Sequence, residues 1–207
     1  MNRKIKTLIA DDHLIVRAGL AALLGTEDDI EVIGQSKNGV EAVRDALALR
    51  PDVVIMDLMM PKKDGVDATA EICSKAPEVR VILLTTFGSS DGIAHALKLG
   101  AAGALLKNAD NTELVAAIRK VNKGAKYVSA AIRRQLAIDP PIPELTQRQR
   151  EILASICQGM TNKDIARQLG IRLDGVNQHV ADILTKIGAA NRTEAVAIAL
   201  RKHLLKI

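Results

Sequence analysis

Residues 5–12 read IKTLIADD, an apolar run that ends in two adjacent carboxylates, Asp11 and Asp12. Adjacent buried acids repel each other and lose hydration, so they cost free energy unless a counter-charge offsets them. The same design recurs at residues 52–57, DVVIMD, where an apolar run ends in Asp57. The pattern predicts buried strands whose ends carry a charged site.

Apolar runs alternate with stretches of helical periodicity through the first part of the chain. The runs lie at residues 5–10, 30–35, 52–57, 79–85 and 102–107. Five strand–helix repeats predict a doubly wound α/β domain, in which helices cover both faces of a five-stranded parallel sheet. Ligands of such sheets bind beyond the carboxyl ends of the strands. We therefore expect one edge to collect Asp11, Asp12, Asp57, Thr85 and Lys107.

These five residues form a chemically coherent set. The carboxylates need a counter-charge, which Mg²⁺ and the Lys107 ammonium supply. With the Thr85 hydroxyl as a donor, the set is suited to stabilise a phosphoryl group that passes to a nucleophilic aspartate. A single acid at a strand end is more simply a helix cap or a solvated loop residue. For five such residues at the strand ends of one parallel sheet, a shared site is the favoured explanation.

Four motifs resemble those of a two-component receiver domain over about residues 3–122. They are LIADDH (8–13), VVIMDLMMPKKDG (53–65), VILLTT (81–86) and GAAGALLK (100–107). The resemblance implies a flavodoxin-like (βα)5 fold. It also implies that a sensor histidine kinase phosphorylates Asp57.

The resemblance extends to individual residues. It implies that Mg²⁺ is held by Asp11, Asp12, Asp57 and the backbone carbonyl of Met59. Lys107 would contact the phosphoryl group, and Thr85 would report its presence. Gly65 matches the turn that follows the phosphorylation loop of the family. The only catalysis implied is autophosphorylation from a phosphodonor and slow autodephosphorylation, so we do not expect an enzyme.

One position departs from the receiver pattern. Receivers of this kind usually carry Tyr or Phe where this chain has Ala104, and the inward turn of that ring accompanies phosphorylation. We interpret Phe87 as a packing or loop residue in preference to a substitute for the ring. An alternative function is therefore a DNA-binding regulator whose receiver acts independently of phosphorylation.

The second part of the chain differs in charge and composition. Residues 1–122 hold 15 Lys and Arg against 17 Asp and Glu, whereas residues 123–207 hold 14 against 7. A basic part suggests a polyanionic partner. Residues 123–143 end in a proline-rich stretch and are interpreted as a linker between a domain at 1–122 and an all-α domain at 144–207.

The helical spacing of the last part predicts a helix-turn-helix. TNKDIARQLG (161–170) would be its first helix and GVNQHVADILTKIG (175–188) its recognition helix. The core-facing positions of the recognition helix then leave as candidate base contacts Asn177, Gln178 and Ala181. The candidate phosphate contacts are Arg148, Lys163, Arg167, Arg172, Lys186 and Arg192. A solvated helical bundle would explain these scattered cations equally well.

Residues 143–207 resemble the LuxR/NarL-type DNA-binding domain through LTxRxxEIL, NKDIA and NRTEAV. The whole chain then resembles a NarL/LuxR-type response regulator, a transcription factor that binds double-stranded DNA as a homodimer. The dimerisation candidates are Ala195, Val196, Ala199 and Leu200, although this stripe also suits packing inside the domain. Arg172 stands at the usual Ser/Thr helix cap, and we expect Asp174 to cap the helix instead. Asn177 replaces a lysine that is common in the family.

The cysteines, the apolar stretches and the absent motifs indicate the cellular compartment and the class of protein. Cys73 and Cys157 are far apart and outside any CxxC motif, which favours reduced thiols. No apolar stretch approaches the ~20 residues of a membrane span, so we expect a soluble cytoplasmic protein with no membrane partner. A nucleotide enzyme of the doubly wound fold would carry GxGxxG or GxxxxGK[ST], and neither motif occurs.

Overall fold

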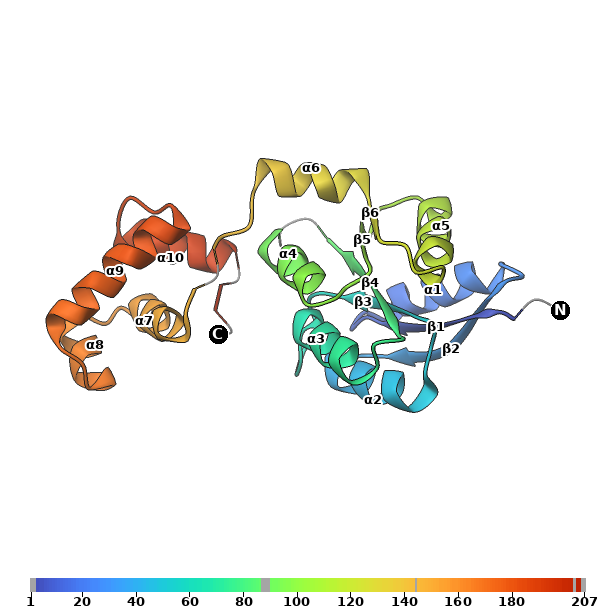
Figure 1. The fold of residues 1–207 in the computed structure, drawn as a ribbon, viewed down its shortest axis with the longest axis horizontal. Coiled ribbons are helices and arrows are strands. Elements are labelled where there is room, and N and C mark those ends of the chain that lie inside the picture. Colours follow the sequence, from blue (N-terminus) through green and yellow to red (C-terminus); the bar gives the residue numbers. More distant parts are fainter. Residues whose placement is uncertain (1–2, 87–89, 144, 203, 206–207) are drawn as a thin grey trace. The chain divides into compact units, whose positions relative to one another are not determined.

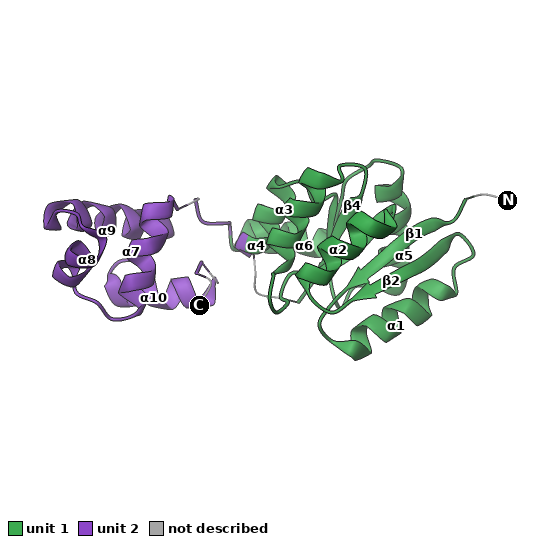
Figure 2. Ribbon diagram, turned by 90° about the horizontal axis from the view of Figure 1, so that it is seen from below, with its two compact units in different colours: residues 1–87, 92–139 green, residues 88–91, 140–207 purple. Residues whose placement is uncertain are grey.

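The computed structural model describes residues 3–86, 90–143, 145–202 and 204–205. The chain divides into two compact units, residues 1–87 with 92–139 and residues 88–91 with 140–207 (Figure 2). Each unit has its own hydrophobic core and is described by itself. Among the described residues, no helix is long and apolar enough to span a bilayer.

The first unit is built on a parallel sheet (Figure 1). Its strands are β1 (Ile5–Ala10), β2 (Ile30–Ser36), β3 (Val53–Asp57), β4 (Arg80–Thr85), β5 (Gly103–Leu106) and β6 (Tyr127–Val128). The strand order is β2-β1-β3-β4-β5-β6, and every neighbouring pair is parallel. The order of the first five strands is that of flavodoxin-like folds, so the predicted fold class is confirmed. The predicted number of strands is wrong, because β6 adds a sixth.

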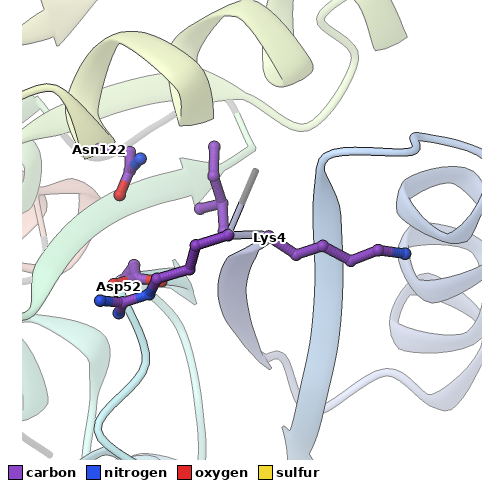
Figure 3. A pocket seen from close by; sticks show the side chains of 5 residues that line it. Lys4, Asp52 and Asn122 are labelled. Atoms are coloured by element: carbon purple, nitrogen blue, oxygen red, sulfur yellow. Dashed lines mark hydrogen bonds and ion pairs between the residues drawn. The ribbon is translucent and has the colours of Figure 1, made fainter. Parts of the chain in front are cut away.

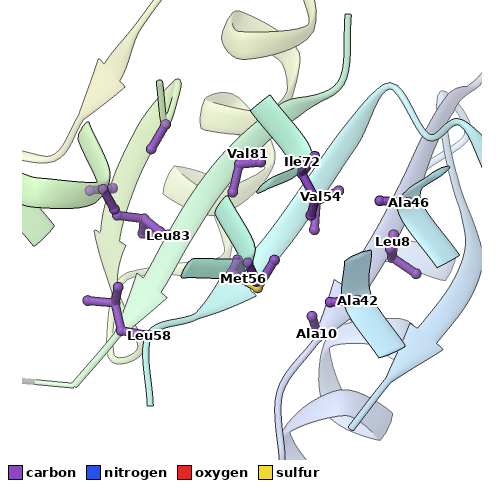
Figure 4. Packing of buried hydrophobic residues seen from close by; sticks show 14 of the residues in the cluster. Leu8, Ala10, Ala42, Ala46, Val54, Met56, Leu58, Ile72, Val81 and Leu83 are labelled. Atoms are coloured by element: carbon purple, nitrogen blue, oxygen red, sulfur yellow. The ribbon is translucent and has the colours of Figure 1, made fainter. Parts of the chain in front are cut away.

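Helices cover both faces of the sheet. They are α1 (Leu14–Gly25), α2 (Gly39–Leu49), α3 (Gly65–Lys75), α4 (Ser90–Lys98), α5 (Asn111–Asn122) and α6 (Ala130–Ile138). Figure 4 shows one layer, in which Leu8, Val54 and Met56 of the strands pack with Ala42 of α2 and Ile72 of α3. Alternate strand residues supply the opposite layer with α1 and α5. Burial on both faces explains why the strands read as continuous apolar runs.

The predicted linker at 123–143 contains structure that the sequence analysis missed. The backbone N–H of Tyr127 donates to the Ala102 carbonyl at 2.9 Å, and that of Ser129 donates to the Ala104 carbonyl at 3.0 Å. The Ser129 side chain then caps α6, whose Ile132 is fully buried in the core of the first unit. The helix ends at Ile138, before the prolines, so the predicted linker keeps irregular structure mainly at its two ends, residues 123–126 and 139–143.

The second unit is helical, as predicted. Its helices are α7 (Gln147–Cys157), α8 (Asn162–Leu169), α9 (Leu173–Ile187) and α10 (Arg192–Arg201). Capping boxes at Thr146 and Thr161 begin α7 and α8. Helix α9, the predicted recognition helix, begins earlier than expected, so Asp174 lies inside its first turn and does not cap it. Arg172 occupies the N-cap position without a side-chain capping bond.

Candidate functional site

The carboxyl edge of the sheet brings the predicted acidic residues together. Asp11 follows β1, Asp57 ends β3, Thr85 ends β4 and Lys107 follows β5. The relative exposures of Asp11 and Asp57 are only 2% and 4%, and that of Thr85 is 1%. Buried carboxylates require partners, because an unpaired buried charge is strongly unfavourable. The structure must therefore supply a cation at this edge.

Lys107 is that cation. Its Nζ lies 2.6 Å from Oδ2 of Asp11 and 2.8 Å from Oδ2 of Asp57, so one ammonium bridges both carboxylates. Burial opposes the charged form of Lys107, but the hydrogen bonds to Asp11 and Asp57 outweigh it and raise the pKa of the ammonium. Burial also raises the pKa of the Asp57 carboxyl, against the opposing effect of Lys107. Asp57 is thus a partly desolvated carboxylate, whose Oδ2 accepts from Lys107 and whose Oδ1 has only the long contact with the Met59 N–H.

Asp12 and His13 extend the acidic cluster toward solvent. His13 Nδ1 lies 2.7 Å from Oδ1 of Asp12 and 3.4 Å from Oδ1 of Asp11. Ligand atoms of Asp11, Asp12, His13 and Asp57 all lie within 4.8 Å of one another. His13 was not among the residues predicted for this edge, although its position directly after the two acids is a visible signal.

This donor set fits a hard divalent cation. The carboxylates of Asp11, Asp12 and Asp57 against one lysine leave a net negative site rich in oxygen ligands, which Mg²⁺ favours. Nitrogen is a poor ligand for Mg²⁺, so His13 is better suited to hold Asp12 than to bind the ion. Met59 lies beside the site, and its N–H faces Oδ1 of Asp57 at 3.4 Å. A metal-ligand role for the Met59 carbonyl stays a prediction.

The loop after Asp57 closes tightly over the end of β3. The Gly65 N–H donates to the Leu58 carbonyl at 2.9 Å, and a Cβ at Gly65 would overlap the Asp57 carbonyl oxygen. Asp64, directly before Gly65, caps α3 by accepting from the Asp67 N–H. Gly65 is therefore needed for close backbone approach, and the position of Asp57 depends on it.

Gly65→Ala should destabilise the first unit by about 1–3 kcal/mol, the usual cost of overpacking. The matched control is Gly19→Ala in α1, where a Cβ would meet nothing within 4 Å. Since alanine favours a helix over glycine by roughly 0.8–1 kcal/mol, this control should stabilise the protein. Urea unfolding measures both changes, and equal effects of the two variants would contradict the close-approach argument.

The residues expected to transmit a signal lie in packed surroundings. Thr85 donates its hydroxyl to the Thr86 carbonyl at 3.1 Å. Ala104 is fully buried, and α6 packs on its strand. Helix α6 thus packs on β5, in which the small side chain of Ala104 provides no aromatic ring. The predicted packing role of Phe87 falls outside the described residues.

A shallow pocket lies among Arg3, Lys4, Ile5, Asp52 and Asn122 (Figure 3). Asp52 directly precedes β3, so this pocket is at the amino end of the strand that carries Asp57 at its carboxyl end. The Asp52 carboxylate accepts from Arg3 at 2.7 Å and from the Lys6 N–H at 2.8 Å. These bonds satisfy the carboxylate and tie the strand ends together, which indicates a structural role.

The second unit exposes the predicted base-contact face of α9. Asn177, Gln178 and Ala181 are exposed, whereas Val176 and Ile183 are fully buried. The Gln178 amide donates to Oδ1 of Asp182 at 2.9 Å, within the same helix. The periodicity therefore identified the outward face of the recognition helix correctly.

The six candidate phosphate contacts occupy different surroundings. Lys163, Arg167 and Arg172 are exposed around α8 and the start of α9. Arg148 is half-buried and pairs with Glu151 at 3.0 Å. Lys186 instead donates to Oε1 of Gln149 at 2.9 Å, which ties α9 to α7. Arg192 bonds the Met160 carbonyl and Oδ1 of Asn162, so its guanidinium has a structural task.

The four dimerisation candidates also differ in exposure. Ala195 and Ala199 are buried in the core of the second unit, and Val196 packs against that core. Leu200 is 51% exposed. Of the predicted stripe, Leu200 is thus available to a partner, whereas Ala195 and Ala199 stabilise the domain itself.

Comparison with known proteins agrees with this architecture. Residues 7–119 match the family model for the response regulator receiver domain, and residues 143–199 match that for bacterial regulatory proteins of the luxR family. The transcriptional regulatory protein LiaR of Bacillus subtilis (strain 168) is 40% identical over 209 residues, covering 97% of this chain and 99% of LiaR.

Solved structures are similar over the same length. The response regulator ChrA of a heme-sensing two-component system is 32% identical with a TM-score of 0.59, covering 98% of this chain and 99% of ChrA. RcsB is 24% identical with a TM-score of 0.69, covering 96% of this chain and 99% of RcsB, and shows the fold alone. The chain belongs to the two-component response regulators that join a receiver domain to a LuxR-type DNA-binding domain.

Proposed function

We propose that this response regulator is controlled by phosphorylation of Asp57 by a sensor histidine kinase. The observation that carries the proposal is the Lys107 bridge between Asp11 and Asp57 at the carboxyl edge of the sheet. Lys107 holds Oδ2 of Asp57, which leaves Oδ1, beside the Met59 N–H, as the nucleophile. As Oδ1 bonds to phosphorus, the bond between phosphorus and the donor breaks.

The other residues at this edge would bind the metal ion and contact the phosphoryl group. Asp11, Asp12 and Asp57 would hold Mg²⁺, with the Met59 carbonyl completing the set. When bound, the ion supplies positive charge that neutralises phosphoryl oxygens. Lys107 supplies a second positive charge from the protein. The Thr85 hydroxyl would turn from the Thr86 carbonyl and donate its hydrogen bond to the new group. Catalysis by this chain is limited to its own phosphorylation and slow dephosphorylation.

The output is transcription control in the cytoplasm. We propose that the chain binds paired half-sites of double-stranded DNA as a homodimer, with α9 in the major groove. RcsB, whose fold is similar, has been solved in complex with DNA and as two dimers bound to two parallel DNAs. The exposed face of α9, with nearby Lys163, Arg167 and Arg172, supports the same use here.

The test is selection of bound DNA from a random duplex pool, with and without Mg²⁺ and beryllofluoride. Phosphorylation shifts an equilibrium by its differential effect on two states, so we expect the affinity for the selected DNA to rise about 5- to 150-fold. Sedimentation of the same samples reports the dimer fraction. If neither affinity nor dimer fraction changes, the proposal is wrong.

A second candidate is a regulator that binds DNA independently of phosphorylation. Its support is the buried Ala104 beneath α6, where receivers usually carry the aromatic half of the switch. Under this alternative, Asp57→Ala leaves the regulation of a target promoter unaltered. Under the leading proposal, the same substitution removes the response to the phosphodonor.

A further inference from the structure

The Asn162 amide, at the start of α8, connects two helices of the DNA-binding unit. Its Nδ2 donates to Oδ1 of Asn177 on α9 at 2.9 Å. Its Oδ1 accepts from the guanidinium of Arg192, at the start of α10, at 3.1 Å. Arg192 also donates to the Met160 carbonyl, directly before the Thr161 cap of α8. One chain of hydrogen bonds therefore ends on an exposed candidate for base contact.

The direction of this chain is determined by its first member. A guanidinium has donors and no acceptor, so Asn162 must turn its oxygen toward Arg192. The Asn162 nitrogen then faces Asn177 and donates a hydrogen bond, which Asn177 must accept through its own side-chain oxygen. Amide orientation follows from such a network, and here the charge of Arg192 leaves one consistent arrangement. The NH₂ group of Asn177 is consequently directed away from Asn162.

We propose that Asn162 and Arg192 are positioning residues that present Asn177 to DNA as a hydrogen-bond donor. The inference rests on the DNA binding proposed above. An asparagine free to use both its oxygen and its nitrogen reads adenine through N6 and N7. Asn177, with its oxygen engaged, instead matches bases that display acceptors, above all guanine with O6 and N7. It disfavours cytosine, whose N4 is a donor.

Reversing one amide provides the sharpest test. Asn162→Asp has acceptors only, so it would hold Arg192 and also require a donor from Asn177. The Asn177 amide must then turn over and direct its oxygen outward. An acid in the first turn of α8 is compatible with the helix dipole, so the variant is expected to fold. The preference at the contacted base should change from guanine over cytosine to cytosine over guanine.

The experiment is selection from a random duplex pool by the full-length chain, its Asn162→Asp variant, Asn177→Ala and the double variant. We expect the wild-type chain to favour guanine over cytosine about fivefold at one position of each half-site, and Asn162→Asp to reverse this ratio. In the Asn177→Ala background, Asn162→Asp should weaken binding to all sequences through its charge without changing any base preference.

The outcomes separate the two proposals. If Asn162→Asp lowers affinity uniformly in the wild-type background, Asn162 is merely structural and the positioning role is wrong. If the preference reverses in both backgrounds, Asn177 is not the reading residue and the inference fails. If the wild-type chain enriches no sequence and binds no duplex, the proposed DNA binding itself is overturned, and this inference with it.

Discussion

Asp57→Asn should abolish covalent phosphorylation of this protein. An amide in place of the carboxylate removes the nucleophilic oxygen, while the side chain keeps its shape and an acceptor for Lys107. We expect no mass increase by one phosphoryl group after incubation with Mg²⁺ and a small phosphodonor, where the wild-type chain is modified. Intact-protein mass spectrometry measures this directly. A phosphorylated Asp57→Asn chain would show that another residue is the acceptor.

Two controls accompany this variant. Asp28→Asn makes the same change at an exposed residue away from the site and should leave phosphorylation intact. Unfolding experiments separate lost chemistry from lost structure. Burial raises the folded-state pKa of Asp57, so its ionisation opposes folding above that pKa. At neutral pH, the free energy of unfolding of Asp57→Asn should therefore be no lower than that of the wild-type chain. Any gain in stability should disappear as the pH falls below the folded-state pKa of Asp57 toward the unfolded value of 3.8.

Lys107→Met should impair both stability and phosphorylation. Removal of the ammonium leaves Asp11 and Asp57 buried near each other without their shared counter-charge. Breaking a buried ion pair from one side costs about 3–5 kcal/mol, and the partial exposure of Lys107 favours the lower end. Loss of a fixed charge that stabilises the transition state should slow phosphorylation roughly 100-fold. Urea unfolding and the initial rate of phosphorylation measure the two effects.

Matched variants separate the causes. Lys126→Met removes an exposed lysine and should change neither quantity. In the double variant Asp57→Asn with Lys107→Met, Asp57 no longer repels Asp11, but Asp11 still lacks the ammonium, so only part of the stability should return. A double variant as unstable as Lys107→Met alone would show that repulsion between the two carboxylates does not cause the defect, which leaves the unpaired charge of Asp11 or lost packing of the lysine stem.

The fold of each unit was largely predictable because its signals are local. Continuous apolar runs predicted β1 to β5, since strands covered on both faces have no polar side. Strand ends predicted the edge at which Asp11 and Asp57 meet. The two-residue strand β6 escaped prediction because it exists only through bonds to the carbonyls of Ala102, directly before β5, and of Ala104 on β5. Helix α6 follows from it, stabilised by burial of Ile132.

Charge and helical spacing did not predict which partner a side chain contacts. Arg192 had the charge of a phosphate contact, yet the structure bonds it to Met160 and Asn162. Ala195 and Ala199 had the spacing of a dimer stripe and lie instead in the domain core. Periodicity says which residues share a helix face, but not which of two neighbours that face meets.

Local sequence patterns are enough to predict a parallel α/β unit with an acidic edge, followed by a basic helical unit. The pattern of apolar residues encodes burial, and the counts of Lys, Arg, Asp and Glu give the charge of each part. The Lys107 bridge between two carboxylates and the hydrogen bonds that link Arg192 to Asn177 through Asn162 are visible in the folded chain alone. The physical reason is the short range of hydrogen bonds: they form only between groups that folding brings within about 3 Å, however far apart they lie in the sequence.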